Sequence, residues 1–88
     1  MRIVIGEDSA LFREGISRLL EDAGHEVVAK ASDAEGLIDA VETARPDLIL
    51  IDVRMPPDLT DDGARAARVL REREPELGIV LLSQHIET

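Results

Sequence analysis

Glu7, Asp8 and Asp52 are acidic residues that stand directly after short apolar segments of the chain. Glu7 and Asp8 follow RIVIG, and Asp52 follows DLILI. If these carboxylates meet, a pair at about 4 Å repels by about 4 kcal/mol at an effective dielectric near 20, so the cluster needs a bound cation or a proton. Neither His nor Cys accompanies these oxygen ligands, which favours Mg²⁺, or Mn²⁺, over Zn²⁺.

A hard cation at such a cluster would allow a particular chemistry. One carboxylate would remain available to attack phosphorus and form an aspartyl phosphate, while the metal offsets the charge of the phosphoryl oxygens. Ser83 follows a further apolar segment, GIVLL, and could donate a hydrogen bond to the same group. The simpler interpretation is that Glu7 and Asp8 cap a helix and that Asp52 begins a turn. Because all four residues directly follow apolar segments, we favour the phosphoryl-accepting site over this simpler interpretation.

Short segments rich in Val, Ile and Leu lead to these positions. They are bounded by turn residues, as buried strands are, and cover residues 2–6, 26–31, 47–51 and 78–82. Segments with helical periodicity separate them. This alternation predicts an α/β fold with one parallel sheet, helices on both faces and right-handed crossovers. Parallel strands end at one edge, where ligands bind, so the acidic residues meet there if the first and third strands are neighbours.

Each helical segment has predicted ends and an apolar face. The second begins at a capping box of Ser32 and Glu35, and the third begins near Thr60 or Asp61. The residues that stop the helices are Gly24, Pro46 and Pro75. The apolar faces consist of Phe12, Ile16, Leu19, Leu20 and Ala23 in the first, Leu37, Ile38 and Val41 in the second, and Ala64, Ala67 and Leu70 in the third.

The net charge of −9 over 88 residues limits the classes of partner. Such a chain repels phosphate backbones and anionic lipid, so we expect no direct binding of DNA or membranes. With one Phe and no Trp or Tyr, the chain offers no aromatic platform for bases. The lack of cysteine suits a reducing cytosol. No segment resembles a signal peptide or a membrane span, and a cytoplasmic location is expected.

With these features the chain resembles the CheY-like receiver domains of bacterial response regulators along its whole length. The resemblance rests on Glu7-Asp8 after IVIG, on LILIDVRMP around Asp52, and on VLLS ending in Ser83. It implies a flavodoxin-like, doubly wound parallel sheet with strand order 2-1-3-4. It also implies that Asp52 accepts a phosphoryl group from a sensor histidine kinase and that Ser83 is the phosphate-dependent switch. The Mg²⁺ ligands that it implies are Glu7, Asp8, Asp52 and the backbone carbonyl of Arg54.

The chain also departs from that family. Receivers carry a lysine at the end of a fifth strand, whereas the single lysine here, Lys30, lies on the second. Residues 1–88 are therefore expected to form a receiver domain without its fifth strand and last helices. Its fourth strand would be an exposed apolar edge, which predicts a homodimer through pairing with a second copy, or a longer polypeptide. The loop RMPPDLTDDG resembles that of LuxR-type regulators, which bind DNA through a helix-turn-helix domain absent from this chain.

Further residues receive a role from the resemblance. Arg54 and His85 lie two residues beyond Asp52 and Ser83, where receivers flank the route of hydrolytic water. Leu11 lies about 120° from the apolar centre of its helix, counting 100° per residue. It would therefore be exposed on the helix that docks the kinase in that family. His25 is expected to be an ordinary surface residue.

Enzymes and a binding module are the alternatives. A haloacid-dehalogenase-type phosphatase needs a second Asp two residues after the first, where this chain has Arg54. No G-x-G-x-x-G follows the first strand, which argues against dinucleotide binding. A pseudo-receiver that binds proteins without phosphorylation is favoured by the missing lysine and opposed by the intact acidic residues and Ser83. We expect a signalling domain whose only catalysis is its own phosphorylation and dephosphorylation.

Overall fold

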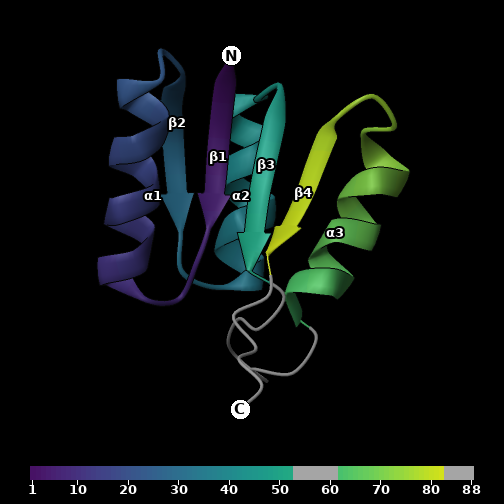
Figure 1. The fold of residues 1–88 in the computed structure, drawn as a ribbon. Coiled ribbons are helices and arrows are strands. Elements are labelled where there is room, and N and C mark those ends of the chain that lie inside the picture. Colours follow the sequence, from purple (N-terminus) through teal and green to yellow (C-terminus); the bar gives the residue numbers. More distant parts are fainter. Residues whose placement is uncertain (53–61, 83–88) are drawn as a thin grey trace.

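The computed structural model describes residues 1–52 and 62–82. Within these ranges four strands and three helices alternate along the chain (Figure 1). The strands are β1 (Arg2–Gly6), β2 (Glu26–Ala31), β3 (Leu48–Asp52) and β4 (Gly78–Leu82). The helices are α1 (Ala10–Asp22), α2 (Ala34–Ala44) and α3 (Asp62–Arg73). None of these helices is long and apolar enough to cross a bilayer.

The strands form one parallel sheet in the order β2-β1-β3-β4, which confirms the predicted order. Their arrowheads point to the same end in Figure 1. Strand β3 begins and ends one residue later than predicted, at Leu48 and Asp52. Asp47, just before it, is hydrogen-bonded to Arg2 at the start of β1. Its N–H donates to the Arg2 carbonyl at 2.8 Å, and its carboxylate accepts from the Arg2 N–H at 2.9 Å.

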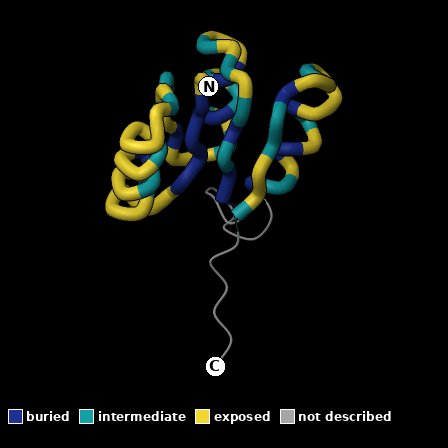
Figure 2. The backbone as a smooth tube through the Cα atoms, turned by 45° about the horizontal axis from the view of Figure 1, so that its top comes forward, coloured by how far each residue is buried: buried dark blue, intermediate teal, exposed yellow. Residues whose placement is uncertain are grey.

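The pleat of the sheet divides the core into two layers. Val4, Ile49 and Ile51 are fully buried and pack with α2 and α3; α2 lies behind the sheet in the view of Figure 1. Ile3 and Ile5 are 2% and 1% exposed. Since successive side chains of a strand point to opposite faces, these two belong to the other layer, which α1 covers along β2 and β1. The buried backbone of β1 is evident in Figure 2.

Helix α1 is less buried than its apolar face suggests. Ile16 and Leu20 are half-buried, whereas Phe12 and Leu19 are 43% and 70% exposed. Ala23 is also exposed. The helix packs on β2, which is an edge strand of the sheet, and on β1, and its apolar stripe is wider than this contact.

Helix α2 begins at a different cap from the one predicted. Asp33, and not Ser32, is the N-cap, and its carboxylate accepts from the N–H of Gly36 at 2.6 Å. A side chain at Gly36 would leave its Cβ only 2.9 Å from that carboxylate oxygen, so the glycine makes this cap the favoured one. The predicted inward residues Leu37 and Val41 are buried, and Ile38 is half-buried.

Helix α3 follows its predicted face and end. Ala67 and Leu70 are buried, Ala64 is half-buried, and the helix ends at Arg73, before Pro75. Its predicted start at residue 60 or 61 lies outside the described residues. The fold therefore matches the predicted βαβαβαβ order. Because the strands are parallel, their carboxyl-terminal ends all lie at one edge of the sheet.

Candidate functional site

Glu7 and Asp52 lie at the carboxyl-terminal ends of neighbouring strands. Gly6 of β1 pairs with Ile51 of β3, so each acidic residue lies one position beyond that pair. Glu7 is 2% exposed and Asp52 is 4% exposed. A buried carboxylate is costly unless it is hydrogen-bonded or its charge is compensated. The sequence therefore correctly predicted that β1 and β3 bring acidic side chains to one edge of the sheet.

The loop between β1 and α1 is fixed by contacts of Glu7 and Ser9. The N–H of Glu7 donates to the carbonyl of Ala31 at 2.9 Å, which extends the β1–β2 pairing by one residue. Its Oε1 accepts from the N–H of Ser9 at 3.0 Å. Ser9 is the N-cap of α1, and its hydroxyl accepts from the Phe12 N–H at 3.3 Å. The Glu7 carboxylate is thus held next to a helix amino terminus, where the helix dipole stabilises negative charge.

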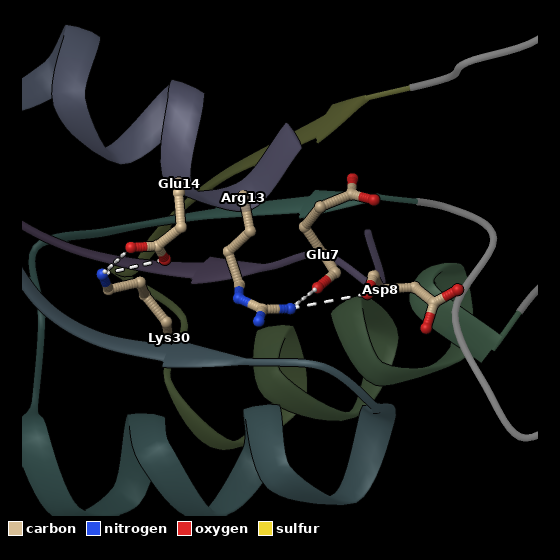
Figure 3. Close-up of polar contacts among 5 residues, drawn as sticks. All are labelled: Glu7, Asp8, Arg13, Glu14 and Lys30. Atoms are coloured by element: carbon tan, nitrogen blue, oxygen red, sulfur yellow. Dashed lines mark hydrogen bonds and ion pairs between the residues drawn. The ribbon is translucent and has the colours of Figure 1, made fainter. Parts of the chain in front are cut away.

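Arg13 reaches back from α1 to the same loop. Its Nη1 donates to the carbonyl oxygen of Glu7 at 2.8 Å and lies 3.5 Å from that of Asp8. Figure 3 shows the guanidinium at these carbonyls, with the carboxylates of Glu7 and Asp8 pointing away from it. The sequence interpretation missed Arg13. Its signal is a cation near a helix amino terminus, where the dipole disfavours positive charge and a local acceptor is needed.

Asp8 differs from its two acidic neighbours because it is exposed. In the part of the chain that the structure describes, no three Asp, Glu or His residues form a group that could hold a metal ion. Oxygen donors nevertheless fit Mg²⁺ in type, and this ion commonly keeps several waters and binds through one or two carboxylates. The buried carboxylates of Glu7 and Asp52, together with Asp8, which directly follows Glu7, fit that mode of binding.

The other residues singled out in the sequence lie elsewhere. Arg54, Ser83 and His85 fall outside the described residues. Leu11 is 87% exposed, as predicted. Lys30 lies on β2, where its Nζ contacts Glu14 of α1 at 3.0 Å (Figure 3). His25 is half-buried and not simply on the surface, since its Nδ1 is buried and has no hydrogen-bond partner among the described residues.

Comparison with known proteins gives a consistent family. Residues 3–88 match the response regulator receiver domain. The transcriptional regulatory protein DegU of Brevibacillus brevis is 41% identical over 86 residues, covering 97% of this chain and 35% of that protein. The chain thus spans little more than a third of such a relative.

Two solved structures share the fold. The signal receiver domain of the putative response regulator NarL from Mycobacterium tuberculosis is 38% identical, with a TM-score of 0.85 over 98% of this chain and 68% of that one. The isolated receiver domain of RcsB from Salmonella enterica serovar Typhimurium, solved with the phosphomimetic BeF3−, is 25% identical. Its TM-score is 0.86, over 99% of this chain and 64% of that one.

Proposed function

Because this chain belongs to the response regulator receiver domain family, we propose that it accepts a phosphoryl group on Asp52 from a sensor histidine kinase. The observation that carries the proposal is the pair of buried carboxylates, Glu7 and Asp52, at adjacent strand ends. Burying a carboxylate is unfavourable for stability unless its charge is compensated, which a bound cation would do. The relative solved with a phosphomimetic supports the same chemistry.

In the proposed reaction, a carboxylate oxygen of Asp52 attacks the phosphorus atom of a phosphohistidine. A P–O bond forms as the P–N bond breaks, and the imidazole leaves and takes up a proton. The products are an aspartyl phosphate and a neutral histidine. With acetyl phosphate as the donor, the bond that breaks is P–O and acetate leaves.

We propose Mg²⁺, or Mn²⁺ in its place, as the cofactor. When bound, the ion supplies positive charge that offsets the charge of the phosphoryl oxygens. The ligands would be Glu7, Asp8, Asp52 and the backbone carbonyl of Arg54. Outside the described residues, Ser83 would be the switch hydroxyl, and Arg54 and His85 would tune the access of water.

The proposed output is control of transcription. Similarity to DegU, a transcriptional regulatory protein, supports this role. DNA would be bound by a domain outside this chain, since the net charge of −9 opposes contact with phosphates. Leu11 is exposed on α1 and lies close in the chain to Glu7 and Asp8. It would contact the kinase. A protein-binding module that is never phosphorylated is the alternative.

Phosphorylation is tested by treating the full-length protein with acetyl phosphate and Mg²⁺ and measuring its intact mass. We expect one added phosphoryl group on the native protein and none on Asp52→Asn. Asp33→Asn is the matched control: it removes a carboxylate just after β2 but keeps a residue that caps helices well, so it should be labelled like the native protein. Equal labelling of Asp52→Asn would reassign the acceptor, and an unlabelled native protein would support the protein-binding module.

A further inference from the structure

We propose that Arg13 is a positioning residue for the acidic pair Glu7-Asp8. The inference rests on the proposed function, in which this pair holds a cation beside Asp52. One guanidinium nitrogen, Nη1, contacts two consecutive backbone carbonyls, at 2.8 Å for Glu7 and 3.5 Å for Asp8. Hydrogen bonds from a charged donor are roughly twice as strong as neutral ones. Arg13 is also half-buried, so water competes less for these acceptors than it would at the surface.

These contacts determine where the carboxylates point. The carbonyl oxygens of Glu7 and Asp8 both face Arg13, and Figure 3 shows both carboxylates pointing away from its guanidinium. Holding two consecutive carbonyls restricts the backbone torsions between them, and these torsions set the directions of the side chains. The loop at Glu7 has further anchors in Ala31 and Ser9. Asp8 is exposed, and the contact found for it among the described residues is that of its carbonyl oxygen with Arg13.

A second cation, Lys30, lies beside α1 and has a different partner. Glu14 accepts from Lys30 Nζ with both carboxylate oxygens, at 3.0 and 3.1 Å. This pair joins α1 to β2, and it engages the carboxylate that follows Arg13 in the chain. Both groups are well exposed, so their ion pair contributes little to stability. It therefore provides a control in which a cation near the site is removed without disturbing the Glu7-Asp8 carbonyls.

A positioning role of Arg13 and a simple effect of its charge predict opposite changes in Mg²⁺ binding when Arg13 is removed. If Arg13 acted only through its positive charge, its removal would strengthen the binding of Mg²⁺, because like charges repel. If Arg13 orients the acidic pair, its removal weakens binding. Residues that orient the ligands of a metal typically change its affinity by about 10- to 100-fold when they are replaced. Because Arg13 acts through the backbone, we expect the low end of that range.

The experiment is a calorimetric titration of the full-length protein with Mg²⁺ alone. Arg13→Met should bind roughly tenfold more weakly than the native protein, whereas Lys30→Met should bind at least as tightly. Without metal, ¹⁵N relaxation should show greater backbone mobility at residues 8 and 9 in Arg13→Met and native-like mobility in Lys30→Met.

Equal or tighter binding by Arg13→Met, with an unchanged loop, overturns the inference. If Arg13→Met does not fold, Arg13→Gln replaces it in the titration. Because the shorter amide side chain cannot reach both carbonyls, Arg13→Gln should also bind Mg²⁺ more weakly than the native protein. Failure of the proposed function is distinguishable from failure of this inference. A native protein that takes up no Mg²⁺ refutes the metal site, whereas the relaxation measurement still decides whether Arg13 orders the loop.

Discussion

The acidic residues at the end of the sheet differ in how firmly the fold holds them. Glu7 is buried, its N–H extends the β1–β2 pairing, and its carboxylate accepts from the Ser9 N–H. Asp8 is exposed and contacts Arg13 only through its carbonyl oxygen. The Asp8 carboxylate therefore adds negative charge near the buried pair without a described partner for that charge. We therefore expect that removing the Asp8 carboxylate weakens the binding of a cation there and costs the metal-free fold little.

This difference predicts how Mg²⁺ affects the melting temperature. At ten times its dissociation constant, Mg²⁺ should stabilise the native chain by about 1.4 kcal/mol. For a domain of this size, that raises the melting temperature by roughly 6–11 °C. Asp8→Ala should lose most of this shift, and its metal-free stability should stay close to native because like charges nearby are reduced. Thermal unfolding with and without Mg²⁺ measures both quantities.

The matched control is Asp39→Ala, which removes an exposed acidic residue of α2. It should keep the full Mg²⁺ shift. A native chain whose melting temperature does not respond to Mg²⁺ would contradict the proposed site.

The predictable part of the site is the part that the strands determine. Glu7 and Asp52 stand at strand ends, and apolar runs reveal strand ends from the sequence alone. Arg13 was missed because its partners are backbone oxygens, which every residue carries. A cation near a helix amino terminus signals that an acceptor is needed, but no residue type shows which acceptor it is. The exposure of Asp8 was likewise not predictable, since it depends on how the loop turns after β1.

At the level of elements, helix ends were predicted where one local signal dominates. Gly24 has a φ of +95°, and the N–H groups of Gly24 and His25 donate to the carbonyls of Glu21 and Leu20 at 3.0 Å each. This pattern of capping bonds is the Schellman motif, for which glycine is preferred. At the start of α2, Ser32 and Asp33 are both competent caps, and the contact of Asp33 with Gly36 decides between them. The burial of the α1 face depends on the width of the sheet, which local sequence does not encode.

Two glycines of the α1 region should respond to alanine with opposite signs. Gly24→Ala places a side chain at a left-handed position and should destabilise the fold by about 1–2 kcal/mol. Gly15 lies inside α1, and a Cβ there would meet nothing within 4 Å. Gly15→Ala should therefore stabilise the fold by about 0.5–1 kcal/mol. Urea unfolding of both variants is the measurement, and shifts of the same sign would show that the cap is not formed as described.

On the scale of the whole molecule, the distribution of apolar surface is uneven. Strand β4 ends the order β2-β1-β3-β4 in the described part of the chain. Val80 and Leu81 of this strand are 39% and 48% exposed. An open groove of about 520 Å³ lies between α3 and β4, with Ala67, Ile79 and Leu81 in its lining. Edge strands of natural proteins are protected by charge, proline or bulges, and residues 78–82 contain neither charge nor proline.

The 88-residue chain should therefore self-associate through β4 at micromolar concentration. Its backbone N–H and carbonyl groups on the open side can pair with the same strand of a second copy, and the exposed Leu81 adds apolar contact. Leu81→Lys should weaken association, because a charge on an edge strand opposes further pairing. Leu19→Lys is the control: it places the same charge on an apolar residue of α1 that is 70% exposed, and it should leave association unchanged. Sedimentation velocity over a range of concentrations separates these outcomes. Equal effects of the two lysines would assign the association to apolar surface in general, and a strictly monomeric chain with a sharp melt would show that β4 is already adequately protected.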